Sequence, residues 1–539
     1  MNSLLLISVS IVIFIIAYKT YGAWLEREWG IDKSAVTPAH SRADGVDYVA
    51  AKPQVLLGHH FASIAGAGPI TGPIQAAIFG WIPVVLWIII GGIFFGGVHD
   101  YGSLTASMKH GGKSIGVIIE DYMGKTGKTL FSAFAWLTLL LVVAAFTNIV
   151  ATTFHNTPEA GSSSLMFIVL AIIFGILVYR KGAPLGISTV FGVIALFACI
   201  WLGTKFPLEL SINTWVVLLG IYIFVASTAP VWILLQPRDY LNSFLLYVMI
   251  AGAVLGIIIS HPTLEMAGFT NFVVKTDTGS QFLFPILFIT VACGAISGFH
   301  SLVGSGTTSK QIDNEKDAKL IGYGGMLIEC VLAVIAIITA AYLSQSDFVA
   351  LLKEGGPVGV FATGVGTFMN QFGIPLETGI SFVSLAVSAF ALTSLDTATR
   401  LGRFIFQEFF EVNQGQGKQS ILTNKYVSTI ITVILGCYFA MGGYAKIWPV
   451  FGSANQLLAA LALLALAVWL KSTGKNYKMF TLPMVFMFCA TLSALVLQVK
   501  ANVADMNIVL MVVPSILFIL AIILAYQGYQ VLVKGKDLR

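Results

Sequence analysis

The chain has 539 residues, of which 57% are hydrophobic and only 10% are charged, whereas about 25% of the residues in a typical soluble domain carry a charge. This composition excludes a water-soluble enzyme, and the abundance of apolar residues excludes a disordered chain. The formal net charge of +5 comes from basic residues scattered between apolar runs, so the sequence offers no basic face for nucleic acid. It therefore predicts an all-α, polytopic membrane protein.

Membrane-spanning helices are the first elements that the sequence predicts, since a helix needs about 20 apolar residues to cross the hydrocarbon core of a bilayer. The first run lacks a preceding basic region and a small-residue cleavage site, so it is predicted to be a retained helix and not a signal peptide. The Gly-rich segment 356–375 is predicted to re-enter the membrane or to lie on its surface. Fifteen apolar runs are predicted to cross it: 2–20, 55–75, 76–98, 131–152, 164–181, 185–204, 213–236, 242–261, 281–303, 322–344, 377–399, 426–446, 448–470, 479–499 and 507–533.

The distribution of basic residues predicts the orientation, because Lys and Arg favour cytoplasmic loops. With fifteen spans and the N-terminus outside, the cytoplasmic segments hold 25 of the 30 Lys and Arg residues and the outer segments hold 5. Without a crossing at 55–75, the split would fall to 20 against 10. The pattern therefore predicts a crossing at 55–75, an external N-terminus and a cytoplasmic C-terminus.

Residues 57–73, LGHHFASIAGAGPITGP, contain glycines and prolines that suit a continuous helix poorly. Pro69 has no amide hydrogen and cannot donate to the carbonyl of residue 65. Free backbone groups cost several kcal/mol each in hydrocarbon, so they persist where protein, water or a ligand satisfies them. The segment therefore predicts an interrupted helix beside a cavity at membrane depth. The alternative is that these residues only let helices pack closely.

A second interruption is predicted at 223–240, where Pro230 follows two hydroxyl residues in ASTAP, a short likeness to ASIAGAGP. Five spans separate the starts of the two helices, and an odd-numbered repeat unit must invert its topology. The predicted fold is a LeuT-like five-plus-five inverted repeat with broken first helices, plus one N-terminal and several C-terminal extra helices. The predicted regions are an N-terminal helix and cytoplasmic loop at 1–54, repeats at 55–204 and 213–399, and accessory helices at 400–539.

Substrate and ion sites are expected at the interruptions, because half-helix N-termini attract anions and unwound carbonyls attract cations. A substrate carboxylate is predicted at the N-terminus near Gly66–Pro69. For the pair Asn455–Gln456 the sequence leaves two alternatives: it binds a substrate carboxylate or amide, or it only links two helices. A monovalent cation is a weaker hypothesis near Ser297 and Ser301, and the sequence offers no firm metal site. The predicted substrate-binding residues are Ser63, Gly66, Gly68, Pro69, Ser227, Thr228, Asn455 and Gln456.

Ionisable residues inside spans are costly and mark functional positions. One interpretation is a hydrated inner rim of ion pairs and helix caps; the other is an inner gate or proton relay, which histidine suits. Asp396 and Arg400 are four residues apart and are predicted to pair, while Glu329 either carries a proton or is a satisfied polar group. The predicted proton-coupling or gate residues are His59, His60, His99, Asp100, Arg238, Asp239, His300, Glu329, Asp396 and Arg400.

Six motifs between about residues 45 and 470 together resemble the carbon starvation protein A family. They are GVDYVAAKPQVLLGHHFASIAGAGPITGP, GGVHDYGSLTASMKHGGKSI, QPRDYLNS, SGFHSLVGSGTTSKQI, LTSLDTATRLGR and IWPVFGSANQLLAALAL. The resemblance implies the fold of the amino acid–polyamine–organocation superfamily and uptake of peptides or of pyruvate with protons across the bacterial inner membrane. It also gives the histidines of GHH, VHD and GFH and the acid–base pair of QPRD as functional residues.

These observations predict a secondary active transporter without a cofactor, an ion-coupled symporter that imports a small carboxylate such as pyruvate or short peptides. Its partners are the substrate, a proton or sodium ion and the lipid bilayer. A sodium-coupled amino-acid or peptide carrier and a channel or exchanger remain alternatives. An enzyme ranks last, because HExxH and GxSxG are absent from the predicted spans and the sequence has no complete Walker A motif. The five cysteines lie in apolar runs without metal-ligand or redox spacing.

Overall fold

The computed structural model describes residues 2–276, 279–411, 420–442, 444–504 and 508–535. Short 3₁₀ or π turns extend several of its helices, among them Gly92–Gly96, Ile176–Arg180 and Lys319–Gly324. The elements are α1 (Ser3–Lys19), α2 (Tyr21–Trp29), α3 (Pro38–Ser41), α4 (Pro53–Ala65), α5 (Gly68–Ala76), α6 (Trp81–Gly91), α7 (Gly97–Lys109), α8 (Ile115–Asn156), α9 (Pro158–Gly175), α10 (Leu185–Lys205), α11 (Ile212–Thr228), α12 (Leu235–Ser260), β1 (Val273–Thr276), β2 (Gly279–Phe282), α13 (Leu283–Thr290), α14 (Gly298–Gly306), α15 (Gly325–Ala341), α16 (Gln345–Asn370), α17 (Leu376–Glu411), α18 (Lys425–Ala440), α19 (Tyr444–Ser472), α20 (Lys478–Ala504) and α21 (Ile508–Leu532).

Among the described residues, twelve helical stretches are long and apolar enough to cross a membrane. Two shorter apolar helices, α11 and α18, and the helix pairs α4–α5 and α13–α14 account for the other predicted spans. Each of the fifteen predicted runs thus coincides with a helix or a helix pair, although residues 443 and 507 lie outside the described part of the chain. The prediction of an all-α, multi-pass membrane protein is confirmed.

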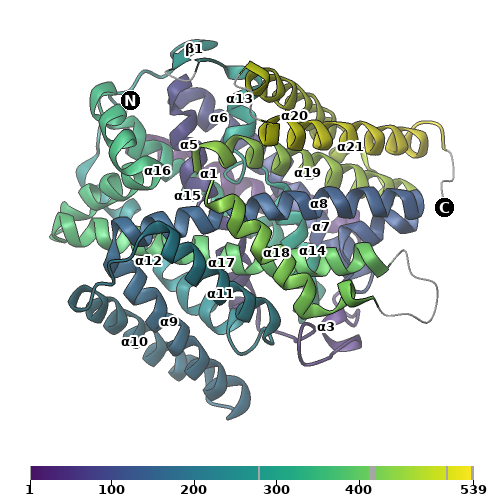
Figure 1. The fold of residues 1–539 in the computed structure, drawn as a ribbon, viewed down its shortest axis with the longest axis horizontal. Helices are drawn as coiled ribbons and strands as arrows, with labels where there is room; N and C mark the ends of the chain where they lie inside the picture. Colours follow the sequence, from purple (N-terminus) through teal and green to yellow (C-terminus); the bar gives the residue numbers. More distant parts are fainter. Residues whose placement is uncertain (1, 277–278, 412–419, 443, 505–507, 536–539) are drawn as a thin grey trace.

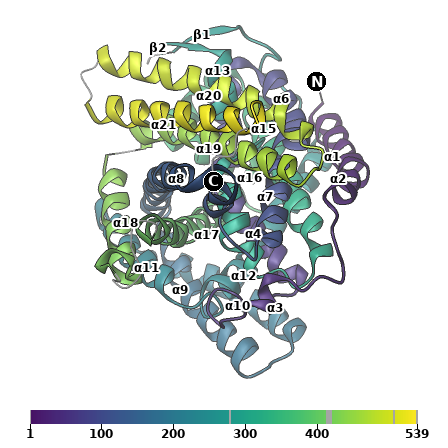
Figure 2. The same ribbon diagram turned by 90° about the vertical axis from the view of Figure 1, so that its right-hand side faces the viewer.

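The bundle carries two peripheral hairpins. In Figures 1 and 2 the antiparallel β1–β2 hairpin lies at the top, and the α9–α10 helix pair lies at the bottom. Helix α10 exposes apolar side chains along its length, including Ile187, Phe191 and Trp201, as a helix that faces lipid does. Helices α8, α19 and α20 run side by side across Figure 1, and α19 is buried within the bundle.

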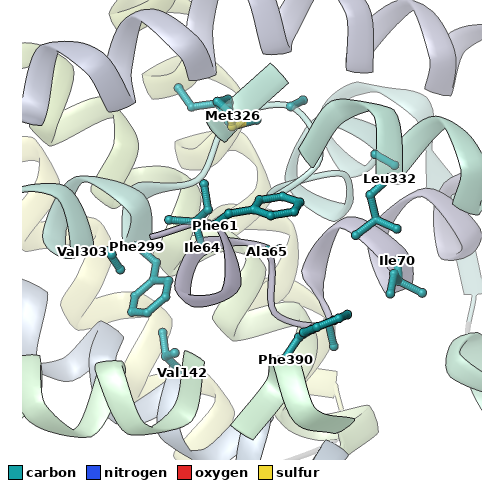
Figure 3. Close-up of a cluster of buried hydrophobic side chains, with 14 of the residues drawn as sticks. Phe61, Ile64, Ala65, Ile70, Val142, Phe299, Val303, Met326, Leu332 and Phe390 are labelled. Atoms are coloured by element: carbon teal, nitrogen blue, oxygen red, sulfur yellow. The ribbon is translucent and has the colours of Figure 1, made fainter. Parts of the chain in front are cut away.

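Two spans are interrupted inside the bundle. The first interruption separates α4 from α5, where Gly66 takes a φ of 45° that L-residues rarely adopt. The second separates α13 from α14, over residues 291–297. Figure 3 shows apolar side chains of α8, α14, α15 and α17 around the chain that connects Ala65 to Ile70. Packing against four other helices therefore holds the first interruption in place.

The second interruption is not where the sequence predicted it. Helix α11 ends at Thr228 and α12 begins at Leu235, so Pro230 lies in the junction between two helices. Because α11 has 17 residues and α12 has 26, the two would together measure about 65 Å at 1.5 Å per residue. That length is about twice the hydrocarbon core, so the helices form two spans and the prediction of one interrupted span at 223–240 is wrong.

The two interruptions lie against each other in opposite chain directions. A Cβ atom added to Gly68 would stand 2.6 Å from the Cβ of Cys293, and one added to Gly72 would stand 3.3 Å from the Cα of Val291. Residue numbers therefore increase along α5 while those of the contacting residues in the second span decrease. The close contact requires glycine at both positions, because a side chain would separate the two segments.

Helix α16 is also broken, at Gly356, which has a φ of 62°. It packs against α5, α12, α15 and α17. The segment 356–375 forms the second half of this helix and the turn before α17, and the whole helix Gln345–Asn370 is long and apolar enough to cross a membrane.

Candidate functional site

A buried network of charged and hydroxyl groups, which we call the Arg238 network, joins α4, α11, α12 and α17. The Arg238 guanidinium contacts the Asp396 carboxylate and the Tyr222 hydroxyl, and its Nη2 lies 2.7 Å from Asp239 Oδ1. His59 Nδ1 lies 2.8 Å from the other Asp239 oxygen, Oδ2. The network consists of His59, Tyr222, Arg238, Asp239, Thr393 and Asp396.

The local sequence explains how α12 places two of these charges. Pro237 lies in the first turn of α12, where a missing backbone N–H costs nothing because the first four amides have no intrahelical acceptor. Arg238 and Asp239 follow at once and are buried at 1% and 0% exposure. The motif QPRD thus begins a helix and buries its acid–base pair there.

Two glutamines extend the network toward the end of α14. Gln311 Nε2 lies 3.5 Å from His59 Nε2 and donates to the Thr307 carbonyl, while Gln236 donates to Gln311 Oε1 at 2.6 Å. His60, the next residue of α4, lies 2.8 Å from the Thr308 hydroxyl through Nδ1. Both histidines of α4 are therefore held against α12 or the end of α14.

A second buried group, the His300 cluster, consists of His99, Asp100, Cys293, His300 and Glu329. Asp100 Oδ1 lies 2.7 Å from His99 Nδ1, and Asp100 Oδ2 lies 2.8 Å from His300 Nδ1. On its other side, His300 Nε2 lies 3.6 Å from Glu329 Oε2. The π segment Gly92–Gly96 directly precedes the turn that carries His99 and Asp100, and such segments occur often at functional sites.

The predicted Asp396–Arg400 pair does not form. Asp396 contacts Arg238 and accepts from the Tyr222 hydroxyl at 2.6 Å, whereas Arg400 Nη1 lies 3.0 Å from Asp47 Oδ1. Arg400 also donates to the carbonyls of Ala226 and Ala229 at the end of α11, where the helix dipole favours a cation. Partners from distant parts of the chain, a loop residue among them, thus satisfy both groups better than the neighbour four residues away.

These residues form the ion pairs that the rim interpretation predicts, but they do not lie at a hydrated surface. The side chains of His59, His99, His300 and Asp239 have no exposed surface, and Arg238 has 1%. Buried charges are costly unless they are paired and hydrogen-bonded. The charges therefore form part of the packed interior, where breaking one pair leaves its partner uncompensated.

Hydroxyl groups of α17 bind the first interruption. Ser394 donates to the Ser63 carbonyl at 2.7 Å, one of the backbone groups near the end of α4, and Ser63 Oγ lies 3.1 Å from Thr397 Oγ1. A Cβ atom on Gly66 would stand 2.7 Å from Ser394 Oγ. The predicted residues Ser63, Gly66, Gly68 and Pro69 are thus brought together, and all are buried.

The pair Asn455–Gln456 holds both ends of the second interruption. Asn455 Oδ1 accepts from the Phe299 amide at 2.8 Å, and Asn455 Nδ2 donates to Ser297 Oγ at 3.0 Å. Gln456 Nε2 donates to the Phe288 carbonyl at 2.9 Å. Neighbouring amides of α19 therefore satisfy the start of α14 and a carbonyl of α13, as the helix-linking interpretation predicts.

The other predicted substrate- and cation-binding residues include Ser227, Thr228 and Ser301. Ser227 and Thr228 end α11, and Thr228 donates to the carbonyl of Phe224 within its own helix. Ser301 donates to the Gly298 carbonyl, which is also a bond within its own helix. The structure thus gives Thr228 and Ser301 local partners.

Several residues of the site escaped sequence analysis. Tyr222, Thr393, Gln311 and Cys293 each contact a predicted residue from a different part of the chain. Hydroxyl residues flank Asp396 in the sequence, but their spacing does not assign them partners, and the five cysteines lack metal-ligand spacing. Sequence spacing carries no signal for such contacts.

A cavity of about 650 Å³ opens beside the first interruption. It lies between the end of α8, the break of α16 and α17, and it reaches Thr71, in the first turn of α5. Its volume falls within the range typical of small-molecule sites. Its polar lining includes Thr71, Asn148, Thr152, Thr153, Glu354 and Ser384.

Two interrupted helices that meet inside an apolar bundle, flanked by buried ion pairs and a polar cavity, define a membrane transporter. The family model described as carbon starvation protein CstA matches residues 2–354 and 349–494. The chain belongs to this family of multi-pass membrane transporters.

Its relatives carry transporter names. The chain is 34% identical to the peptide transporter CstA of Escherichia coli (strain K12), over 92% of this chain and 80% of the relative. It is 30% identical to the peptide transporter CstA of Bacillus subtilis (strain 168), over 100% of this chain and 99% of the relative. It is also 30% identical to the pyruvate/proton symporter BtsT of Escherichia coli (strain K12), over 94% and 83%.

Among solved structures, the chain is similar to the manganese transporter of Eremococcus coleocola in complex with an aromatic bis-isothiourea substituted compound. The TM-score is 0.51 at 12% identity, and the match covers 90% of this chain and 99% of that one. A mutant of the same transporter, in which alanine replaces one histidine, gives a TM-score of 0.52 at the same identity and coverage. At this level of identity the likeness shows a shared fold.

Proposed function

We propose that the protein is a proton-coupled symporter that imports a small carboxylate, pyruvate or a short peptide, across the bacterial inner membrane. The names of its relatives support this substrate class. The observation that carries the proposal is the Arg238 network, a buried chain of histidine, carboxylate and guanidinium groups beside an interrupted helix. The N-terminus lies outside and the C-terminus inside, in line with the distribution of basic residues.

The fold is a five-plus-five inverted repeat with boundaries that differ from 55–204 and 213–399. Matching contacts support this assignment: α4 packs on α12 as α13 packs on α19, and α5 packs on α15 as α14 packs on α7. Likewise α8 contacts α19 as α17 contacts α12. The first repeat consists of α4–α5, α6–α7, α8, α11 and α12, and the second of α13–α14, α15, α17, α18 and α19, with α9–α10 and α16 as insertions.

The substrate enters through the cavity that reaches Thr71 and places its carboxylate at the N-terminal end of α5, near Gly66–Pro69. The first amides of a helix have no intrahelical acceptor, and together with the helix dipole they favour an anion there. The cavity of about 650 Å³ has room for a dipeptide as well as for pyruvate. The cavity lies at the end of α8, which this orientation places on the outer side.

The proton acts at the His59–Asp239 pair. His59 lies on α4, Asp239 on α12 and Asp396 on α17, so these charges tie three helices together. Adding a proton to the pair changes its net charge and weakens the attraction of Asp239 for Arg238. The contacts on the inner side of the bundle then loosen, and the substrate site opens inward. His60, His99, Asp100, His300, Glu329 and Arg400 act as parts of the closed gate.

The test is uptake into proteoliposomes that contain the purified full-length chain. Labelled pyruvate and labelled dialanine are compared under an imposed inward proton gradient, an imposed sodium gradient and no gradient. Accumulation of either substrate driven by the proton gradient alone supports the proposal. Accumulation driven only by sodium supports the sodium-coupled carrier, and uptake indifferent to both gradients rejects coupling. Counterflow exchange separates a carrier from a channel.

A further inference from the structure

Three potential metal ligands from three different elements meet inside the bundle. Cys293 lies in the second interruption, His300 in the first turn of α14 and Glu329 on α15. Their ligand atoms all lie within 4.8 Å of one another, and all three residues are buried. We propose that this cluster binds one divalent transition-metal ion of the zinc type.

The orientation of His300 is the first argument. Asp100 Oδ2 lies 2.8 Å from His300 Nδ1, so the carboxylate holds the proton of the ring on Nδ1 and leaves the lone pair of Nε2 free. Histidines that bind metal ions almost always donate their other ring N–H to a carboxylate, a carbonyl or a water. Asp100 in turn lies 2.7 Å from His99 Nδ1, so the orienting carboxylate is itself held in place.

The distance between the facing ligand atoms is the second argument. His300 Nε2 and Glu329 Oε2 are 3.6 Å apart, whereas an N–H···O hydrogen bond measures about 2.7–3.2 Å. Two ligands that each lie about 2.0–2.2 Å from one tetrahedral zinc ion are separated by about 3.4 Å. The observed distance therefore fits two ligands of a shared cation better than a direct hydrogen bond.

The unsatisfied acceptors are the third argument. Within the described part of the chain, His300 Nε2 and both Glu329 carboxylate oxygens have no hydrogen-bond partner, and neither side chain has exposed surface. Two bare acceptors that face each other in a buried site are costly. A bound cation satisfies all of them at once.

The ligand types select the metal. A thiolate, an imidazole and a carboxylate together suit Zn²⁺ and its spectroscopic substitute Co²⁺, whereas Ca²⁺ and Mg²⁺ prefer oxygen ligands alone. The ion would connect the second interruption to α14 and α15, and the thiol that binds it also packs against Gly68 of the first interruption. The site thus ties the contact between the two interruptions to a metal ion.

The experiment measures metal binding by the full-length chain, purified in detergent through a tag without histidines after growth in Co²⁺-supplemented medium. The expected result is about one Co²⁺ per chain by elemental mass spectrometry, with a thiolate-to-cobalt charge-transfer band in the absorption spectrum. Cys293→Ser should remove the band, and Glu329→Gln should lower affinity at least tenfold. Asp100→Asn should lower it by about 10–100-fold, as changes to groups that orient a ligand do.

The matched control is Cys330→Ser, which replaces a buried cysteine directly after Glu329 and should keep both the band and the metal. A chain without bound cobalt, or a band that Cys330→Ser removes and Cys293→Ser leaves, overturns the proposal. If a variant fails to fold, the unmodified chain still decides. These measurements need no transport, so their outcome is independent of the proposed symport.

Discussion

The Arg238 guanidinium of α12 contacts the carboxylate of Asp396 of α17, which lies 158 residues further along the chain. Both groups are buried, at 1% and 0% exposure. Asp239 connects the same guanidinium to His59 of α4. One arginine therefore links three helices that are distant in sequence.

Removing the Asp396 charge should destabilise the fold. Asp396→Asn leaves a buried guanidinium with one carboxylate fewer, and removal of one partner from a buried ion pair costs about 3–5 kcal/mol. Chemical unfolding in mixed micelles should show a loss of this size. The control is Asp313→Asn, whose pair with His40 is about half exposed and should contribute less than about 1 kcal/mol. Equal losses in the two variants would contradict the structural assignment.

Widening the first interruption should abolish transport. In Gly68→Ala the new Cβ would stand 2.6 Å from the Cβ of Cys293, so the two interrupted spans must move apart. Uptake should fall at least tenfold while the amount of protein in the membrane stays within about twofold. Gly186→Ala is the matched control, since a Cβ there would meet nothing within 4 Å. Normal uptake by Gly68→Ala would show that the contact is dispensable.

The amide of Asn455 should matter through its acceptor oxygen. Asn455→Leu leaves the Phe299 N–H and the Ser297 hydroxyl without this partner, a cost of about 1–3 kcal/mol. Asn455→Asp retains the acceptor for the Phe299 amide and should recover part of the stability. Thermal unfolding in detergent measures both variants, with the exposed helix cap Asn476→Ala as control. A leucine variant as stable as the unmodified chain would argue against the linking role.

Coupling should fail when His59 is replaced. His59→Gln removes the ring whose Nδ1 lies 2.8 Å from Asp239 Oδ2, where we propose that the proton acts, so an inward proton gradient should no longer drive accumulation, while counterflow exchange persists. Transport assays in proteoliposomes at several external pH values give the profile. His155→Gln is the control, because this exposed histidine contacts only the Leu210 carbonyl among its described contacts. An unchanged pH profile in His59→Gln would leave His59 a structural role.

The orientation is testable by labelling introduced cysteines in intact cells. In a Cys489→Ser background, an impermeant maleimide should label Lys275→Cys, which lies in β1. It should leave Lys33→Cys and Lys316→Cys unlabelled until the membrane is opened, because the charge pattern places both on the cytoplasmic side. All three side chains belong to residues with solvent-accessible surface. The reverse labelling pattern would invert the proposed topology.

Hydropathy predicted the spans well because the requirement for about 20 apolar residues is local. The first interruption was visible for the same reason, since Gly66, Gly68 and Pro69 disfavour a helix by themselves. The second was missed because residues 291–297, VACGAIS, contain no proline and only one glycine. Amides of Asn455 and Gln456, more than 150 residues away, support that interruption, and no local pattern reports them.

The sequence predicts most residues of the candidate site, but it does not predict which of them contact each other. Ionisable residues inside apolar runs are conspicuous, so His59, Asp239, Glu329 and Asp396 could be selected from the sequence. The spacing of Asp396 and Arg400 satisfied the rule for neighbours on one helix face. In the structure Asp396 contacts the guanidinium of Arg238 on another helix instead, because a buried charge needs a partner and tertiary packing decides which one it meets.

Two adjacent amide side chains of α19 couple this helix mechanically to the second interrupted span. Asn455 accepts from an amide at the start of α14, and Gln456 donates to a carbonyl of α13. A rotation or translation of α19 therefore displaces both halves of the interrupted span together. The distance between the end of α13 and the start of α14 can therefore increase only if α19 moves or if one of these two hydrogen bonds breaks.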